Sequence, residues 1–289
     1  RYKKIVLFCT HDYSITGAPL AIYNTSLTLK NNNFFPIIIG FKPGKLLERY
    51  KEAEIPCFCS EEFNQVSDKM KLLLSLVDFI FLNTVLSFKV YLNRPQNTPY
   101  IWRISEGYSI EEDYPACIEV LKKAEKLHAV SLYVQNILNK YNDNVELLLY
   151  GVPDVSNVYL DKNRKRTTKN IKYCVIGNLC NRKGHNIIFE AFKSLPDTIK
   201  EDVEIFFIGE QGHYQYPKDK HLHFLGRLEG SEKYKILASS DILLCPSLDD
   251  PNPQVVMEGM MMHKPCIVSD RVGQSKYITH KKDGFIVKA

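Results

Sequence analysis

Short runs of apolar residues alternate along this chain with longer stretches in which apolar and polar residues repeat at helical spacing. A run of about four to eight apolar residues is typical of a strand buried on both faces of a parallel sheet, and the stretches between are typical of the connecting helices. The pattern therefore predicts an α/β fold. In the first half the predicted strands are 4–10, 36–41, 79–82, 100–104, 127–130 and 145–150, and the predicted helices are 19–30, 69–76, 112–123 and 132–141.

A polar segment interrupts this alternation in the middle of the chain. Apolar periodicity is lost after Gly151 and returns at Ile171, and the segment between them holds a basic run from Lys162 to Lys169. We interpret this run as a solvated linker rather than a patch that binds nucleic acid. Because 289 residues are more than one hydrophobic core usually holds, we expect two domains, 1–155 and 156–289.

A second alternating series follows the polar segment. Two successive series predict two Rossmann-like α/β domains that face each other across a cleft, with ligands at the carboxyl ends of the strands. The chain stops at Ala289, directly after a strand and without a helix to cover it, which leaves truncation of the C-terminal end open. In this series the predicted strands are 171–177, 203–209, 221–225, 242–245, 266–269 and 285–287, and the predicted helices are 184–195, 231–239 and 253–262.

Composition indicates a folded globular protein without a membrane span. Hydrophobic residues make up 45% and charged residues 25% of the chain, as in folded globular proteins, and no run reaches the roughly 18 to 20 apolar residues of a membrane span. The eight cysteines form no CxxC pair, and several lie inside apolar runs, so we expect reduced core thiols and a cytoplasmic protein. We expect no metal site and no transmembrane segment, while peripheral contact with a membrane is compatible with the sequence.

The segment from Cys245 to Gly259 carries the most informative chemistry, because it reads as a strand, a loop and the start of a helix. Asn252 is a favourable N-cap, and Pro253 suits the first helical turn. This arrangement predicts free N–H groups on Gln254, Val255 and Val256. Such a helix start attracts phosphate through its unpaired donors and its dipole.

Two carboxylates flank this predicted anion site. Glu258 follows Gln254 by four residues and shares its helix face, so its carboxylate can accept both hydroxyls of a ribose. Asp250 precedes the helix and can contact the hydroxyls of a sugar beyond the diphosphate. The alternative for Asp250 is a turn or capping acid.

Two further loops follow predicted strands. In the loop 177–184, Arg182 and Lys183 can neutralise a diphosphate, and the alternative for Arg182 is a surface charge. Gly17 follows the first strand, where the lack of a Cβ allows backbone to approach a ligand closely.

These motifs resemble the signature of the family 4 (group 1) retaining glycosyltransferases, which have the GT-B fold. In that family two acids separated by seven residues bind the donor sugar and the ribose, the positions of Asp250 and Glu258 here. Lys183 followed by glycine matches the family, whereas Asn178 stands where an arginine is common, and Asp250 stands where glutamate is usual. Gly209 falls where the family has a loop around the nucleotide.

The resemblance implies a function as well as a fold. It implies a metal-independent hexosyltransferase without a cofactor, in which an acceptor hydroxyl attacks a nucleotide diphospho-sugar from the front face and the leaving phosphate acts as base. The N-terminal domain would bind the acceptor, a carbohydrate or a lipid-linked or protein-linked sugar, in surface polysaccharide or glycoconjugate synthesis. It implies catalytic roles for Lys183, Asp250 and Glu258, and donor binding by Gly17, Asn178, Arg182, Lys183, Gly209, Gln254, Val255 and Glu258.

Departures from the family pattern keep other functions open. The family often has a histidine after the strand at 100–104, and this chain has Ser105 and Glu106 there. One alternative is a non-catalytic GT-B-like partner subunit, because a fold by itself does not establish activity. The other is a sugar phosphorylase or a nucleotide-sugar epimerase on the same scaffold.

Overall fold

The computed structural model describes residues 3–160 and 169–289, and the chain divides into two compact units, Arg1–Leu149 and Tyr150–Ala289. We call them the N-unit and the C-unit. The division falls a few residues before the boundary expected after residue 155, and Val155 contacts the C-unit, where its N–H donates to Sδ of Met261 at 3.2 Å. The short helix α8 (Ser156–Tyr159) packs on a helix of the C-unit. Most of the basic run, from 162 to 166, lies outside the described residues.

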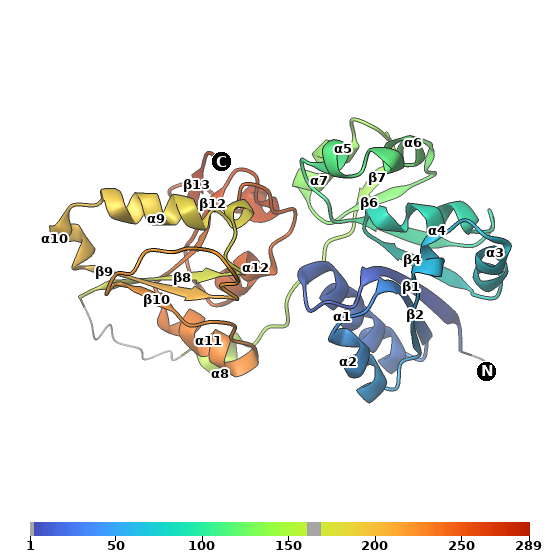
Figure 1. Ribbon diagram of the computed structural model, residues 1–289, viewed down its shortest axis with the longest axis horizontal. Coiled ribbons are helices and arrows are strands. Elements are labelled where there is room, and N and C mark those ends of the chain that lie inside the picture. Colours follow the sequence, from blue (N-terminus) through green and yellow to red (C-terminus); the bar gives the residue numbers. More distant parts are fainter. Residues whose placement is uncertain (1–2, 161–168) are drawn as a thin grey trace. The chain divides into compact units, whose positions relative to one another are not determined.

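The N-unit is built on a seven-stranded parallel sheet in the order β3-β2-β1-β4-β5-β6-β7 (Figure 1). Its strands are β1 (Ile5–Asp12), β2 (Phe35–Lys42), β3 (Cys57–Cys59), β4 (Phe79–Asn83), β5 (Tyr100–Ile104), β6 (Leu127–Ala129) and β7 (Val145–Leu147). Its helices are α1 (Gly17–Asn31), α2 (Leu46–Glu52), α3 (Asp68–Ser75), α4 (Phe88–Asn93), α5 (Ile110–Asp113), α6 (Pro115–Lys123) and α7 (Leu132–Leu138).

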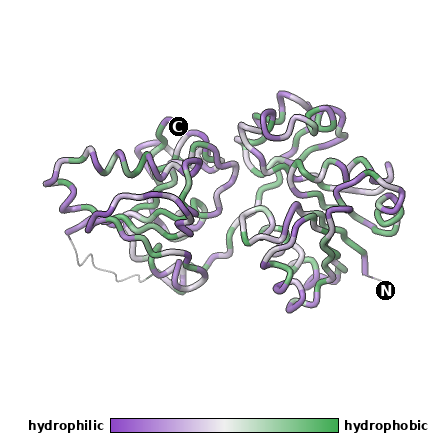
Figure 2. Tube along the Cα trace, in the orientation of Figure 1, coloured by the Kyte–Doolittle hydropathy of each residue, from purple (hydrophilic) through white to green (hydrophobic). Residues whose placement is uncertain are grey.

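The middle of this sheet forms the core of the N-unit. Consecutive residues of β1 from Val6 to Cys9 are all at most 4% exposed, because helices cover both faces of a parallel sheet. Figure 2 shows this concentration of hydrophobic residues along the strands. The uninterrupted apolar run that predicted a buried strand is therefore explained by its central place in the sheet.

Three expectations for the N-unit need correction. The single helix predicted over 112–123 is wrong: α5 ends at Asp113 and α6 begins at Pro115, whose ring nitrogen has no hydrogen to donate to a continuing helix. The strand predicted over 145–150 ends at Leu147. The strand β3 and the short helices α2 and α4 were not predicted, because three to seven residues are too few to show a clear period.

The C-unit holds a six-stranded parallel sheet in the order β10-β9-β8-β11-β12-β13. Its strands are β8 (Ile171–Ile176), β9 (Val203–Ile208), β10 (Leu222–Phe224), β11 (Ile242–Cys245), β12 (Cys266–Ser269) and β13 (Gly284–Val287). Besides α8, its helices are α9 (His185–Ser194), α10 (Asp197–Lys200), α11 (Gly230–Ser239) and α12 (Gln254–Met261).

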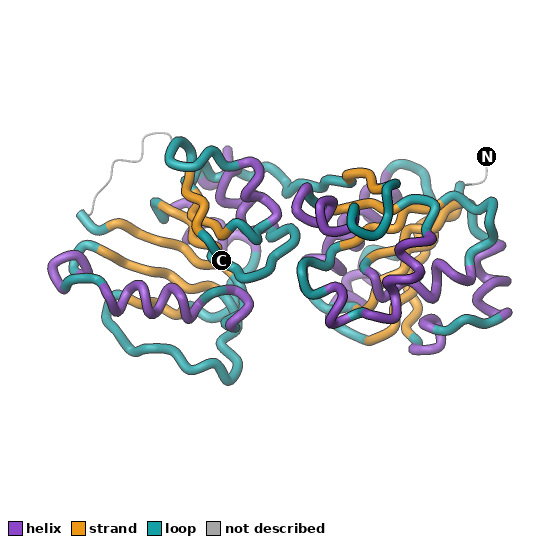
Figure 3. The backbone as a smooth tube through the Cα atoms, turned by 90° about the horizontal axis from the view of Figure 1, so that it is seen from above, coloured by secondary structure: helices purple, strands orange, loops and turns teal. Residues whose placement is uncertain are grey.

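Alternate residues of the C-unit strands face two different apolar layers. On β8, Val175 packs with Phe189 and Phe192 of α9, whereas its neighbour Cys174 packs with Leu237 of α11 on the opposite face. Figure 3 shows the strands as a layer between helices. The two-residue period of a strand thus distributes one run of apolar residues between two cores.

The order of the C-unit strands reverses between β8 and β11. The chain leaves β8 towards α9 on one face and leaves β11 towards α12 on the other, so the loops after these neighbouring strands diverge. Ligands of open α/β sheets bind at such a point, beyond the carboxyl ends of the strands. Within the described part of the chain, no helix has both the length and the apolar character needed to cross a membrane.

Candidate functional site

The loops that follow β8 and β11 are bonded directly to each other. The backbone N–H of Leu248 donates to the carbonyl oxygen of Arg182 at 2.8 Å, and the Arg182 guanidinium donates to the carbonyl oxygen of Asp249 at 2.7 Å. Arg182 is nevertheless exposed, so its binding role and the alternative of a surface charge both stay predictions. These bonds hold the predicted cationic loop against the predicted acidic loop.

Gly184 allows the two loops to come this close. Its φ is +74°, and a Cβ built on it would lie 2.1 Å from the carbonyl oxygen of Pro246. Any other residue would meet both the left-handed backbone and that oxygen. The glycine after Lys183 is thus required by packing, whatever ligand the loop binds.

Lys183 and Asp250 form an ion pair at the centre of the site. The Lys183 ammonium contacts Oδ2 of Asp250, and the hydroxyl of Ser247 lies 3.4 Å from the same oxygen. The two charged side chains are 22% and 10% exposed, so the pair is largely withdrawn from water. The side chain of Asp250 contacts a lysine and a serine rather than the start of a helix, which disagrees with the capping alternative.

The start of α12 differs in detail from the expectation. Pro253, not Asn252, is the N-cap residue, and Oδ1 of Asn252 instead accepts a hydrogen bond from the side-chain amide of Gln274. The N–H of Val256 donates to the carbonyl oxygen of Pro253 at 3.1 Å, so the prediction that it is free is wrong. Gln254 and Val255 precede that bond and remain the candidates for anion binding.

Glu258 lies one turn further along α12 and is only 5% exposed. Its Oε1 accepts hydrogen bonds from the Lys233 ammonium at 2.6 Å and from the Tyr234 hydroxyl at 3.3 Å. Its Oε2 is buried and has no hydrogen-bond partner among the described residues. A buried carboxylate oxygen without a donor is unfavourable, and a ligand hydroxyl would satisfy it.

The loop after β9 is fixed next to the loop after β8. Oδ1 of Asn178 accepts a hydrogen bond from the N–H of Glu210 at 3.0 Å. A Cβ on Gly209 would lie 2.1 Å from the carbonyl oxygen of Gly177, so only glycine fits. Asn178 and Gly209 therefore have structural roles at the edge of the site, and their predicted contact with the donor stays a prediction.

The predicted residues of the N-unit lie at the carboxyl ends of its own central strands. Gly17 is the first residue of α1, and a Cβ on it would meet nothing within 4 Å. Arg103 on β5 is buried and donates to Oδ1 of Asn83 at 3.0 and 2.8 Å and to the carbonyl oxygen of Ala18 at 3.4 Å. The start of α1 is thereby connected to β4 and β5.

Glu106 follows β5 at this end of the N-unit sheet. Its Oε2 accepts hydrogen bonds from the N–H groups of Val85 at 3.1 Å and Ser105 at 3.0 Å. Burial raises the pKa of Glu106 to about 7, although these donors and the nearby charge of Arg103 oppose the rise. This carboxyl group therefore changes its protonation near neutral pH.

Two contacts of the candidate site were missed by the sequence interpretation. Lys233 and Tyr234 lie on α11, about 25 residues before Glu258, and nothing in their local pattern indicates that they face it. Only the packing of α11 beside α12 brings them together. By contrast, the pairing of Lys183 with Asp250 joins two residues that the motifs had already indicated.

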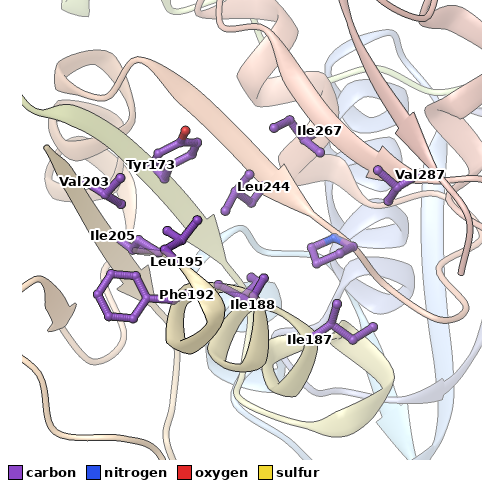
Figure 4. A pocket seen from close by; sticks show the side chains of 12 residues that line it. Tyr173, Ile187, Ile188, Phe192, Leu195, Val203, Ile205, Leu244, Ile267 and Val287 are labelled. Atoms are coloured by element: carbon purple, nitrogen blue, oxygen red, sulfur yellow. The ribbon is translucent and has the colours of Figure 1, made fainter. Parts of the chain in front are cut away.

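An apolar cavity of about 290 Å³ lies elsewhere in the C-unit, between α9 and the sheet (Figure 4). Aliphatic and aromatic side chains line it, including Ile188 and Phe192 of α9 and Leu244 of β11. It holds none of the charged residues described above. The candidate site is therefore the polar group at the carboxyl ends of β8 and β11, not this cavity.

Comparison with known proteins finds a family match within the C-unit. Residues 158–289 match the family model for glycosyl transferases group 1. The uncharacterized glycosyltransferase MJ1069 of Methanocaldococcus jannaschii is 24% identical over 183 residues, which are 58% of this chain and 47% of that protein. The lipopolysaccharide glucosyltransferase WaaG of Escherichia coli is 24% identical over 144 residues, 47% of this chain and 37% of that protein. The chain thus spans less than half of the length of these relatives.

Solved structures show the same two-unit fold. The crystal structure of Anabaena Alr3699/HepE in complex with UDP superposes with a TM-score of 0.78 at 18% identity and covers 99% of this chain and 85% of that one. The structure of WaaG superposes with a TM-score of 0.61 at 15% identity and covers 98% and 86%. The fold is therefore GT-B, as the sequence predicted.

Proposed function

We propose that this chain, whose residues 158–289 match the group 1 glycosyl transferases, transfers a hexose from a nucleoside diphosphate sugar to an acceptor hydroxyl with retention of configuration. The observation that carries the proposal is the ion pair of Lys183 with Asp250 at the switch point of the C-unit sheet, with Glu258 buried on α12, the helix that follows the loop of Asp250. The cation Lys183 suits the diphosphate of such a donor, and the acids Glu258 and Asp250 suit its ribose and its hexose.

The diphosphate is assigned to the loop after β8 and the start of α12. Lys183 and Arg182 supply positive charge, and the first N–H groups of α12, at Gln254 and Val255, supply donors aligned with the helix dipole. These groups bind the donor in its ground state. They stabilise the departing nucleoside diphosphate more strongly, because negative charge grows on it during transfer.

The ribose and the sugar are assigned to the two acids. Oε2 of Glu258 lacks a donor and would accept the ribose hydroxyls. Asp250 would accept hydroxyls of the transferred hexose, once the diphosphate has drawn the Lys183 ammonium away from it. Donor binding in this scheme exchanges one partner of Lys183 for another, so phosphate and sugar recognition are coupled.

The chemistry proposed for the chain needs no nucleophile from the protein. The acceptor oxygen forms its bond to the anomeric carbon on the face from which the diphosphate leaves, and the leaving phosphate oxygen takes the acceptor proton. The positive charge that the reaction requires is supplied by Lys183 and Arg182, so we propose a metal-independent enzyme without a cofactor.

Substrates and setting are proposed from what similar proteins bind. HepE was crystallised with UDP and with UDP-glucose, and WaaG is a lipopolysaccharide glucosyltransferase. We accordingly propose a uridine diphosphate hexose as donor. The acceptor would be a carbohydrate or a lipid-linked or protein-linked sugar in cytoplasmic steps of surface polysaccharide or glycoconjugate synthesis, bound by the N-unit near Gly17 and Glu106.

Calorimetry with a panel of nucleoside diphosphates tests the first step of this proposal. Binding of at least one of them is expected, and binding of none would favour a non-catalytic partner subunit. Product analysis by NMR then separates the enzyme classes. A retained anomeric configuration in a new glycoside supports transfer, free epimerised donor indicates an epimerase, and a sugar 1-phosphate made from a glycan and phosphate indicates a phosphorylase.

A further inference from the structure

Lys233 and Tyr234 of α11 both contact one oxygen of the Glu258 carboxylate and leave the other free. The Lys233 ammonium lies 2.6 Å from Oε1, and the Tyr234 hydroxyl lies 3.3 Å from the same atom. Oε2 has no partner among residues 3–160 and 169–289 and is buried. The carboxylate is therefore held on one side only.

The two residues that hold Glu258 are themselves packed together. The Lys233 ammonium lies 4.6 Å from the centre of the Tyr234 ring, and that ring packs on Tyr159 of α8 with centroids 5.4 Å apart. Burial, with the Glu258 charge beside it, raises the pKa of Tyr234 to about 12, so its hydroxyl remains a donor at neutral pH. The support behind Oε1 thus extends from α12 through α11 to α8.

The contacts to Oε1 decide how the other oxygen of Glu258, Oε2, is presented to a ligand. A carboxylate this deeply buried is unfavourable unless a positive charge lies beside it. Lys233 supplies that charge, at a side chain that is only 19% exposed. Because both donors contact Oε1, they restrict rotation of the carboxylate and leave Oε2 as the oxygen without a donor.

We infer that Lys233 is a positioning residue for Glu258, which holds the carboxylate turned so that Oε2 accepts the vicinal hydroxyls of the donor ribose. The inference rests on the proposed function, in which Glu258 binds the ribose. Lys233 acts in it through Glu258 and not through the diphosphate.

Calorimetry with uridine diphosphate and its 2′,3′-dideoxy analogue tests this role. In the unmodified protein, loss of both hydroxyls should weaken binding by about tenfold or more, as expected for hydrogen bonds to a charged acceptor. In Lys233→Met this penalty should fall to about threefold or less, because the carboxylate is no longer held. Lys235→Met is the matched control: it removes the same charge from an exposed position of α11 and should keep the full penalty.

A cycle with Glu258→Gln separates positioning from direct contact with phosphate. In the Glu258→Gln background, Lys233→Met should change the affinity for uridine diphosphate by less than about twofold. The neutral pair also removes the unpaired buried charge that the single variant leaves, so folding is preserved. Lys233→Arg should restore most of the penalty.

The measurements distinguish failure of the positioning role from failure of the proposed function. An unchanged dideoxy penalty in Lys233→Met would overturn the positioning role and leave the proposed function standing. An equal loss of affinity in both backgrounds would also overturn it and would assign Lys233 to the diphosphate. If the unmodified protein bound no nucleoside diphosphate at all, the proposed function itself would fail.

Discussion

The ammonium group of Lys183 lies against the carboxylate of Asp250, so the loop after β8 and the loop after β11 share one ion pair. In the absence of a ligand the two charges neutralise each other in a place that is largely withdrawn from water. A diphosphate that binds here competes with Asp250 for the lysine. The first two predictions concern the two members of this pair.

Substitution of Lys183 by alanine should lower the rate of sugar transfer by about 100-fold or more, since it removes a cation from the leaving diphosphate. Initial rates with a UDP-hexose measure the effect. The single variant leaves the Asp250 charge unpaired and will also destabilise the C-unit, whereas Lys183→Ala with Asp250→Asn should recover thermal stability but bind uridine diphosphate more weakly than Asp250→Asn alone. Equal affinity in the double variant and in Asp250→Asn would show that Lys183 has only a structural role.

Substitution of Asp250 by asparagine should separate nucleotide binding from transfer. Asparagine keeps the shape of the side chain but no longer competes for Lys183, so the affinity for uridine diphosphate should rise by about threefold to tenfold. Turnover of the UDP-hexose should fall by about 100-fold, because the contact with the hexose is lost. Calorimetry and steady-state kinetics measure the two effects. Asp249→Asn removes the same charge from the neighbouring position, and an identical response there would attribute both effects to charge alone.

Substitution of Gly184 by alanine should destabilise the C-unit by about 3 kcal/mol or more, since the added Cβ meets the carbonyl oxygen of Pro246 and the backbone is left-handed. Gly212 provides a matched control. Its φ of +54° carries a similar backbone cost, but a Cβ on it meets nothing within 4 Å, so Gly212→Ala should cost only about 1 kcal/mol. Urea unfolding followed by circular dichroism gives both values. Equal costs for the two variants would show that the contact with Pro246 is not limiting.

The elements that the sequence predicted well are the long apolar runs. The run around Val6 to Cys9 is buried on both faces of its sheet, so its pattern depends little on the rest of the fold. Short edge elements such as β3, and the break of a helix at Pro115, are set by packing and by single residues. Those features have too little periodicity to be read in advance.

Some residues of the candidate site were likewise indicated by the sequence, and others were not. Lys183 and Asp250 follow neighbouring parallel strands, and the edge where such strands end brings them together; the motifs had indicated both residues but not their ion pair. Lys233 lies within a helix that has no such constraint. Its contact with Glu258 depends on how α11 and α12 are rotated against the sheet, and only coordinates show that.

Glu106 should make the stability of the N-unit fall as pH rises. Its pKa is raised from an ordinary value near 4.5 to about 7 in the folded protein, so the folded state binds this proton more tightly than the unfolded state does. Stability is therefore highest below the unfolded pKa and is lost between about pH 4.5 and pH 7, by about 3 kcal/mol in total.

Trp102, the single tryptophan of the chain, is buried on the same strand that Glu106 follows, so its fluorescence in urea reports unfolding of this unit. Glu106→Gln should remove this part of the pH dependence, while Glu112→Gln, at an exposed position of α5, should keep it. The same pH slope in all three proteins would mean that the Glu106 carboxyl group titrates near its ordinary value.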